Sequence, residues 1–389
     1  MTNSELKQEF IKIFGGNEDD IRLFASPGRV NLIGEHTDYS GGFVFPAALT
    51  FCTTVAARVR DDNKIRMKAT DLPEIVEGTT DTLENFKDLK WGNYQFGVFT
   101  ELKKAGYNIV GADMLFHDTT PHGAGLSSSA AIEVSSAIAM AALGGATDID
   151  SIEKAKLSQL AEHNYVGVKC GIMDQFASAM GKKNHAIFLD CKTLDYQLVP
   201  INIDGYKLVL SNTNKKHSLG ASKYNERRHE CEAGFEILKK ELPSATCLGD
   251  ITPEEYYRVK DAIKDETVER RVRHVVEEDA RVKKSIEVLT AGDLVTFGKL
   301  MTASHESLRD LYEVSCDELD ILAAEALKVD GVLGSRMTGA GFGGCTVSLV
   351  KDDAVDTFID RLGKVYLDKV GYEASFYITE IGDGGRELK

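Results

Sequence analysis

The stretch Pro121-His122-Gly123-Ala124-Gly125-Leu126-Ser127-Ser128-Ser129-Ala130-Ala131 decides how the chain is interpreted. A short apolar run before it, residues 112–116, predicts a strand, and the alanine-rich run 129–143 after it predicts a helix. Glycines let the backbone approach a ligand closely, and the first-turn amides of a helix have no partner inside the helix. A helix start of this kind binds phosphate, and the Ser129 hydroxyl could ligate a phosphate-bound Mg²⁺. A capped helix after a tight turn fits the same residues, and no P-loop lysine follows, so both interpretations stay open.

Outward from this loop, strands and helices do not alternate regularly. The first half predicts strands at 21–26, 53–60 and 186–190, with helices at 94–105 and from Asp150 onward. The second half predicts strands at 207–211, 332–337, 346–350 and 374–379, a long helical stretch at 221–328 and a helix at 354–370. This order favours an α+β fold over a doubly wound parallel sheet. The length of 389 residues favours two domains, which we place at 1–200 and 201–389.

The composition excludes several kinds of partner. Lysine and arginine number 46 against 61 acidic residues, a formal charge of −15, which repels nucleic acid and anionic membranes. Seven scattered cysteines without a C-x-x-C pair predict reduced thiols in the cytoplasm. Residues 1–16 have no signal-peptide core, and no apolar run is long enough to span a membrane.

A second stretch, Arg29-Val30-Asn31-Leu32-Ile33-Gly34-Glu35-His36-Thr37-Asp38-Tyr39, holds an unusual density of polar side chains. Many donors and acceptors in one small loop suit a sugar, because each hydroxyl group both gives and receives hydrogen bonds. A solvated loop with an ordinary ion pair is the commoner explanation. The spacing does not fit a zinc site.

Two acidic residues farther along have competing explanations. Asp174 stands in the otherwise apolar stretch Cys170-Gly171-Ile172-Met173-Asp174-Gln175-Phe176, where a lone buried charge would be costly. It is therefore paired or functional, or it caps a helix over 175–180. Glu162 lies on the preceding helix, where a solvated glutamate is the ordinary case.

The glycine cluster Gly339-Ala340-Gly341-Phe342-Gly343-Gly344 matches the dinucleotide-binding pattern G-x-G-x-x-G. That motif needs a helix after the glycines, whereas a strand-like run follows them here. A glycine-rich hairpin packed close to a bound ligand fits better, and a plain hairpin loop is the alternative.

Taken together, these segments resemble the galactokinase branch of the GHMP small-molecule kinases. Three motifs carry the resemblance in family order: residues 28–39, residues 123–131, and residues 334–344, which read GSRMTGAGFGG. The first is specific to galactokinases and close relatives, and the other two mark the superfamily. Similar sequence at residues 170–175, 212–219 and 224–228 extends the resemblance over nearly the whole chain.

The resemblance implies a two-lobed fold with mixed sheets and helices in each lobe and the active site in the cleft between them. It implies phosphorylation of the anomeric C1 hydroxyl of galactose by ATP, which gives galactose 1-phosphate and ADP and begins the Leloir pathway of galactose catabolism. Asp174 matches the proposed catalytic base, and Arg29 matches the arginine that stabilises the transition state.

The same resemblance implies the binding residues. Sugar contacts are matched by Glu35, His36, Thr37, Asp38, Gly171, Asp174 and Tyr224. Nucleotide contacts are matched by Gly123, Ala124, Gly125, Leu126, Ser127, Ser128, Ser129 and Trp91, although Trp91 could equally be a packing residue. The Mg²⁺ ligands are matched by Ser129 and Glu162.

Two other functions stay open at this point. One is a kinase for a related sugar such as N-acetylgalactosamine, because the sequence does not reveal the pocket width near the 2-hydroxyl. The other is a non-catalytic sensor of galactose and ATP, which the intact Ser128-Ser129-Ala130 disfavours because such sensors are altered there. We expect a cytoplasmic monomer that binds small molecules, with no nucleic-acid or membrane partner.

Overall fold

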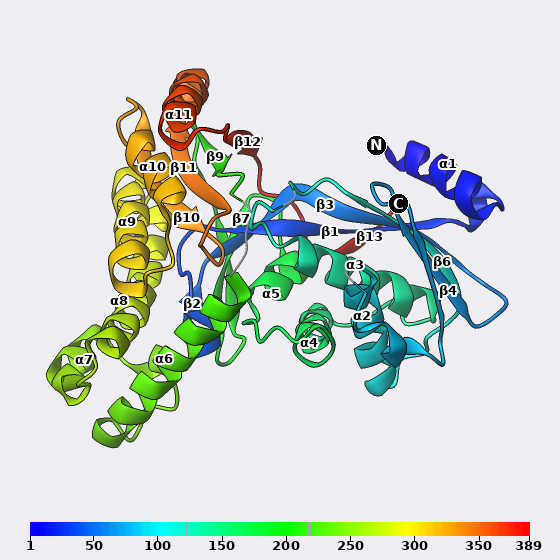
Figure 1. The fold of residues 1–389 in the computed structure, drawn as a ribbon, viewed down its shortest axis with the longest axis horizontal. Helices are drawn as coiled ribbons and strands as arrows, with labels where there is room; N and C mark the ends of the chain where they lie inside the picture. Colours follow the sequence, from blue (N-terminus) through cyan, green and yellow to red (C-terminus); the bar gives the residue numbers. More distant parts are fainter. Residues whose placement is uncertain (90, 122, 216–219) are drawn as a thin grey trace.

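The computed structural model describes residues 1–89, 91–121, 123–215 and 220–389. Its helices and strands form two parts that lie side by side, one built on a six-stranded sheet and the other on a four-stranded sheet (Figure 1). This arrangement confirms the α+β fold class. Among the residues that the structure describes, no helix combines the length and the apolar character needed to cross a bilayer.

The six-stranded sheet has the order β13-β1-β3-β6-β4-β5. Every neighbouring pair is antiparallel except β4 and β6, which are parallel. Its strands are β1 Arg22–Asn31, β3 Pro46–Val59, β4 Lys64–Ala69, β5 Ile75–Thr79, β6 Ala112–Asp118 and β13 Arg386–Leu388. Because β13 pairs with β1, the end of the chain returns to the sheet of the first half.

Four helices cover one face of this sheet and α1 (Asn3–Phe14) lies on the other (Figure 1). The central helix of the four, α3, is rich in buried alanines, whose small side chains let it pack closely against β1 and β3. The main apolar core lies between these helices and the sheet. The four helices are α2 Gly92–Lys104, α3 Ser128–Leu143, α4 Ser151–Ala161 and α5 Met173–Met180.

The second part is built on an antiparallel sheet of order β10-β11-β9-β12. A small sheet of order β2-β7-β8 belongs to the first half. The strands are β2 Phe43–Val44, β7 His185–Asp190, β8 Tyr196–Pro200, β9 Tyr206–Asn212, β10 Val332–Thr338, β11 Cys345–Lys351 and β12 Ser375–Thr379. The helices are α6 Gly220–Glu241, α7 Pro253–Val259, α8 Glu266–Thr290, α9 Leu294–Ser307, α10 Asp317–Ala326 and α11 Val355–Val370. One apolar cluster contains residues of both parts and joins them.

The predicted elements are found close to their expected positions, with three differences. The first strand runs on to Asn31, so Arg29 lies on β1 and not in the polar loop. The long helical stretch is divided into separate helices, α6 to α10. Helix α5 begins at Met173 with Ile172 at the N-cap, so Asp174 lies in the first turn and does not cap the helix. A carboxylate in the first turn still interacts favourably with the helix dipole.

Candidate active site

A cavity of about 650 Å³ is lined by residues of both parts of the molecule. Its walls come from β1 and the loop after it, the loop before α3 and the start of that helix, the segment between α4 and α5, and the first turn of α5. The β10–β11 hairpin, Tyr94 on α2 and Tyr224 on α6 complete them. A volume of this size is typical of small-molecule sites. Most of the residues predicted from the sequence meet here, but Thr37 and Trp91 do not line the cavity.

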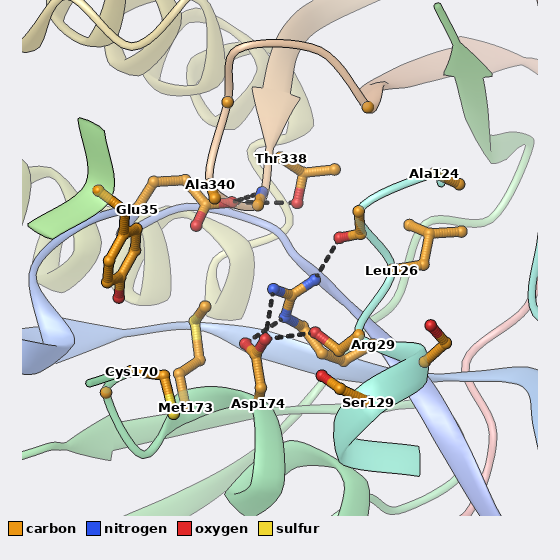
Figure 2. A pocket seen from close by; sticks show the side chains of 18 of the residues that line it. Arg29, Glu35, Ala124, Leu126, Ser129, Cys170, Met173, Asp174, Thr338 and Ala340 are labelled. Carbon is orange, nitrogen blue, oxygen red and sulfur yellow. Dashed lines mark hydrogen bonds and ion pairs between the residues drawn. The ribbon is translucent and has the colours of Figure 1, made fainter. Parts of the chain in front are cut away.

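A partly buried ion pair joins Arg29 to Asp174 in this cavity (Figure 2). Arg29 Nε and Nη2 donate to the two carboxylate oxygens at 2.7 and 3.0 Å, and Nη1 donates to the carbonyl of Gly125 at 2.9 Å. The Ser127 hydroxyl donates to Asp174 Oδ2 at 2.5 Å. The Arg29 side chain is 4% exposed and that of Asp174 is 30% exposed, so the carboxylate is the member open to a ligand.

A β-bulge sets the position of Arg29. The register of β1 against β3 shifts between Pro27 and Arg29, and Gly28 lies at the shift. A Cβ atom on Gly28 would lie 2.4 Å from the carbonyl oxygen of Leu126, and the Arg29 amide donates to that same oxygen at 3.0 Å. The loop before α3 can therefore reach Arg29 because residue 28 is glycine.

That loop directs the start of α3 toward the cavity. Gly123 and Gly125 have φ near +70°, and the N-cap residue Ser127 has φ of 58° in the left-handed region. The Ser127 side chain does not cap the helix, because its hydroxyl is bonded to Asp174. The first-turn amides and the positive end of a 16-residue helix lie beside the cavity, which residues 123–129 line. This is the arrangement expected of a phosphate site. His122, within the quoted motif, lies outside the described residues, as do residues 216–219 of the quoted stretch 212–219.

The second glycine cluster forms the antiparallel β10–β11 hairpin that the sequence predicted. Its backbone packs directly on the loop before α3. A Cβ atom on Gly339 would lie 2.9 Å from the Gly125 carbonyl oxygen, and one on Gly344 would lie 3.3 Å from the Ala124 oxygen. Both hairpin glycines also have positive φ, near +88° and +78°. The hairpin therefore forms a wall of the cavity close to where phosphate would bind.

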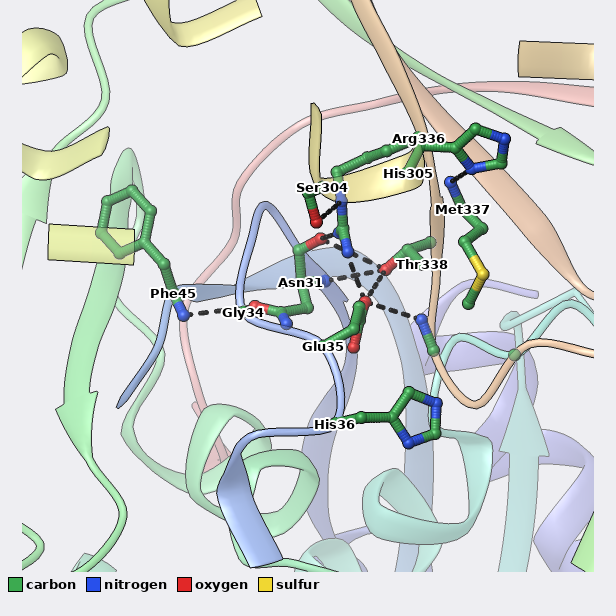
Figure 3. A network of polar contacts seen from close by, with 12 residues as sticks. Asn31, Gly34, Glu35, His36, Phe45, Ser304, His305, Arg336, Met337 and Thr338 are labelled. Atoms are coloured by element: carbon green, nitrogen blue, oxygen red, sulfur yellow. Dashed lines mark hydrogen bonds and ion pairs between the residues drawn. The ribbon is translucent and has the colours of Figure 1, made fainter. Parts of the chain in front are cut away.

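Glu35 connects the loop after β1 to β10 (Figure 3). Its Oε1 atom accepts from the Gly339 amide at 2.8 Å and from the Thr338 hydroxyl at 3.0 Å, and Arg336 Nη1 lies 3.4 Å away. The residue is 1% exposed. One carboxylate oxygen is thus committed to the protein, which leaves Oε2 for the predicted sugar contact.

His36 and Thr37 also direct their side chains at protein groups. The two ring nitrogens of His36 contact the Tyr39 hydroxyl at 2.8 Å and the Ala340 carbonyl at 3.2 Å. Burial is the largest effect that lowers the pKa of His36, to about 3, so the ring is neutral. The Thr37 hydroxyl donates to the backbone carbonyls of Gly34 in its own loop and of Phe43 at the start of β2. Thr37 therefore shapes the loop from behind the cavity wall.

Asp38 lies against Gly171 and near Asp174. A Cβ atom on Gly171 would lie 1.8 Å from Asp38 Oδ2, so only glycine fits there. Burial and, next, the charge of Asp174 raise the pKa of Asp38 to about 7. Tyr224 lines the same cavity, and burial followed by the charge of Asp38 raises the pKa of its phenol. Two carboxyl groups and a phenol facing one space suit a ligand with several hydroxyl groups.

A second polar cluster surrounds Glu162, and Ser129, the other predicted Mg²⁺ ligand, lines the same cavity. Burial raises the pKa of Glu162, and the neighbouring Cys170 thiol and Ser129 hydroxyl act in the opposite direction. Gln175 Nε2 donates to Glu162 Oε2 at 3.3 Å and to Glu133 Oε2 at 3.0 Å. Burial raises the pKa of Glu133 well above its ordinary value, and its Oε1 has no partner among the described residues.

The hydroxyl and carboxylate oxygens of this cluster are of the kind that Mg²⁺ binds. Mg²⁺ at kinase sites takes one or two carboxylates beside phosphate oxygens and water. Within the described part of the chain, no group of three or more His, Cys, Asp or Glu side chains could hold a metal ion. Ser129 and Glu162 supply a hydroxyl and a carboxylate beside the phosphate loop, which is the partial ligand set that such an ion needs.

Trp91 stands apart from these groups. It occupies the N-cap position of α2, and its ring packs edge-on against Phe116 with centroids 6.3 Å apart. These contacts are those of a packing residue, and the predicted adenine contact stays a prediction.

Sequence reasoning missed Glu133, Gln175 and Tyr94. Glu133 is the single charged residue of α3, and a lone charge in an apolar helix is the same signal that singled out Asp174. Gln175 directly follows Asp174 and could have been noted with it. Tyr94 lines the cavity from α2, and nothing in its local sequence distinguishes it from an ordinary helix residue.

The fold and the cavity define a GHMP kinase. The family description "GHMP kinases N terminal domain" matches residues 93–182, and "GHMP kinases C terminal" matches residues 285–368. The mevalonate kinase of Methanococcus jannaschii shares the fold, with a TM-score of 0.68 at 19% identity over 93% of this chain and 98% of that one.

Proteins more similar to this chain show which branch of the GHMP kinases it belongs to. The "Galactokinase galactose-binding signature" matches residues 8–59. A galactokinase of Clostridium acetobutylicum is 49% identical over 386 residues, 98% of each chain. The crystal structure of Lactococcus lactis galactokinase complexed with galactose superposes with a TM-score of 0.96, at 43% identity and 99% coverage of both chains. The chain belongs to the galactokinase family, and it is a kinase.

Proposed function

We propose that this chain transfers the γ-phosphoryl group of ATP to the anomeric C1 hydroxyl of galactose, giving galactose 1-phosphate and ADP. Membership of the galactokinase family supports the reaction. The observation that carries it is the Arg29–Asp174 pair, whose carboxylate opens into the cavity beside the start of α3.

Asp174 receives the C1 hydroxyl. Phosphoryl transfer depends chiefly on positioning and on stabilising charge, because its transition state is loose. The C1 oxygen forms a bond to the γ-phosphorus, the bond from that phosphorus to the β–γ bridging oxygen breaks, and ADP keeps the electron pair. Asp174 orients the hydroxyl and takes its proton late in the reaction, while Arg29 offsets the charge that develops between donor and acceptor.

The phosphates of ATP would bind residues 123–129 at the start of α3. Ser129 and Glu162 would hold Mg²⁺ there, and the donor set described above supports this assignment. When bound, the ion neutralises charge on the β- and γ-phosphates. Glu162 lies mostly buried, so its carboxylate would be positioned before the nucleotide arrives.

The sugar would bind between the loop after β1 and the start of α5. Asp38 and Tyr224 face this space with polar groups, and Gly171 leaves room for Asp38. Glu35 would use its second carboxylate oxygen, and His36 would contribute through its ring face and backbone. Thr37 would act indirectly by holding the loop, and Trp91 would lie near the adenine.

The other two functions are less well supported. A non-catalytic sensor would not need the Arg29–Asp174 pair together with an intact phosphate loop. A kinase for N-acetylgalactosamine would fall outside the galactokinase relatives that the chain matches over nearly its full length.

We also propose a cytoplasmic monomer whose lobes divide near residue 200. All seven cysteines are free thiols, as expected in a reducing compartment. Among the strands that the structure describes, β13 would be the one from the second half that pairs into the six-stranded sheet of the first lobe.

A coupled assay of ADP release tests the proposal directly. The wild-type protein should release ADP in the presence of galactose, ATP and Mg²⁺, and it should release much less with glucose or N-acetylgalactosamine. Asp174→Asn should lower kcat by about 10²- to 10⁴-fold, the usual contribution of a general acid or base. Galactose binding without turnover by the wild-type protein would favour the sensor. Near-normal turnover of Asp174→Asn with an intact fold would disprove the assigned role.

A further inference from the structure

A line of four polar side chains runs from helix α6 to the β10–β11 hairpin. Cys231 Sγ lies 3.1 Å from the Tyr312 hydroxyl, which lies 2.7 Å from the Tyr39 hydroxyl. The Tyr39 hydroxyl lies 2.8 Å from His36 Nδ1, and His36 Nε2 lies 3.2 Å from the Ala340 carbonyl oxygen. The line links four separate segments of the chain, those that hold His36 and Tyr39, Cys231, Tyr312 and Ala340.

The contact between His36 Nε2 and the Ala340 carbonyl determines which group donates in each of the other hydrogen bonds. A backbone carbonyl only accepts hydrogen bonds, so His36 Nε2 must carry the proton in its bond to Ala340. In a neutral ring Nδ1 is then an acceptor, and the Tyr39 hydroxyl must donate to it. The Tyr39 oxygen then accepts from Tyr312, whose oxygen accepts from the Cys231 thiol.

The surroundings of His36 favour the neutral ring that this direction requires. The ring is 4% exposed, and burial is the largest effect that lowers its pKa, to about 3. His274, Arg227 and Arg336 add positive or potentially positive charge near it, which disfavours a second proton. The rings of Tyr224 and Tyr312 enclose it at centroid distances of 5.5 and 4.9 Å.

We propose that Tyr39, Tyr312 and Cys231 are positioning residues that hold His36 as the Nε2–H tautomer. In this tautomer His36 connects the loop after β1 to the glycine-rich hairpin by a hydrogen bond. This inference rests on the proposed function, because it concerns the same cavity. His36 joins the loop that carries Asp38 to Ala340, next to Gly339, which packs on the phosphate loop. This hydrogen bond therefore holds the walls for both substrates at a fixed separation.

The first test is kinetic. Tyr39→Phe removes the donor and leaves His36 Nδ1 buried without a partner. This loss would change the equilibrium constant for substrate binding about tenfold. We expect the KM for galactose to rise about tenfold and the KM for ATP to rise as well, while kcat stays within about threefold of the wild type, since no reacting atom is touched.

Tyr366→Phe is the matched control. Tyr366 is another buried tyrosine, and its hydroxyl donates to the Thr213 carbonyl at 2.7 Å in the second part of the molecule. Its removal should leave both KM values unchanged. Equal kinetics for Tyr39→Phe and Tyr366→Phe would overturn the proposal.

The far end of the line offers a test that does not depend on Tyr39→Phe folding. Cys231→Ala should raise the galactose KM about threefold by removing the terminal donor, and Cys231→Ser should restore it, because serine keeps a hydroxyl donor. If serine rescues no better than alanine, the thiol acts by packing alone and the line does not begin there.

The tautomer can be read in the wild-type protein by nitrogen NMR after labelling with ¹⁵N-histidine. The His36 signals, assigned by their loss in His36→Asn and their shift in Tyr39→Phe, should show a protonated Nε2 and an unprotonated Nδ1 at neutral pH. An Nδ1–H tautomer or an imidazolium would overturn the proposal. Absence of galactose-dependent ADP release from the wild-type protein would instead contradict the proposed function.

Discussion

Replacing Arg29 with lysine keeps a positive charge beside Asp174 and removes the geometry of the guanidinium. Three of its nitrogen atoms are used, two on the carboxylate oxygens of Asp174 and one on the carbonyl of Gly125. A lysine ammonium is a single point of charge on a flexible stem and cannot occupy these three directions together. The variant therefore separates the effect of charge from the effect of placement.

The expected loss follows from the contacts that lysine cannot keep. A hydrogen bond to a charged group contributes about 1.5–3 kcal/mol. The Arg29 site is nearly closed to solvent, so water replaces the lost contacts poorly. If lysine keeps the charge and loses one contact that matters in the transition state, the transition state loses about 1.5–3 kcal/mol of stabilisation, and kcat/KM falls about 13- to 160-fold. Contacts in one network are not additive, so we do not double the loss for a second contact.

The coupled ADP-release assay measures this loss, and urea unfolding measures the accompanying change in the free energy of unfolding. Arg66→Lys is the control, because Arg66 also binds a buried carboxylate, that of Asp113. This ion pair lies away from the cavity, and Asp113 would still bind Arg58 and Arg60 in the variant. Arg66→Lys should change kcat/KM by less than about twofold. The reasoning fails if Arg29→Lys stays within threefold of the wild type, since charge alone would then account for the role of Arg29.

Three further predictions concern the neighbouring groups and the fold. Gly171→Ala should raise the galactose KM at least about tenfold while kcat changes less, because the new Cβ would lie 1.8 Å from Asp38 Oδ2. With the pKa of Asp38 near 7, the galactose KM should fall as pH rises through 7, since the carboxylate accepts more hydrogen bonds than the acid, and Asp38→Asn should remove this dependence. The contribution of Asp38 to folding stability has the opposite sign: it is present below its ordinary pKa of 3.8 and lost as pH rises through 7, as urea unfolding across this range would show. Gly363 lies inside α11, and a Cβ atom added there would lie 3.5 Å from Phe376. Because alanine favours a helix more than glycine does, Gly363→Ala should raise the free energy of unfolding by about 0.5–1 kcal/mol, and a lower value would mean that Phe376 cannot accommodate the methyl group.

The parts of the site that the sequence predicted are those whose structure is set locally. The glycines and serines at 123–129 determine a tight loop and an open helix start within a few residues, and the structure has both. The 339–344 cluster predicted a hairpin because a strand-like run follows it, and β10 and β11 pair as expected. These inferences needed no knowledge of distant contacts.

The direction of each side chain was not predictable in the same way. Thr37 and Asp38 are adjacent polar residues in one motif, yet Thr37 bonds to its own loop and Asp38 faces the cavity. Which of the two faces a ligand depends on the turn that follows β1 and on the residues that close over it. Arg336, one of the partners of Glu35 on β10, lies 301 positions away in the chain, and no local pattern relates the two residues.

Under the proposed mechanism, the position of Arg29 would let one residue serve both substrates. Its guanidinium bridges the carboxylate that would receive the sugar hydroxyl and the carbonyl of Gly125 in the loop that would bind the phosphates. Transfer between two bound substrates requires the reacting atoms to be held about 3–3.5 Å apart and in line. The planar guanidinium belongs to a residue of β1, at the bulge where Gly28 lets the phosphate loop approach. This one rigid group would therefore set the separation of the two subsites. The sheet therefore contributes to the chemistry, because the position of the guanidinium is only as rigid as the strand that carries it.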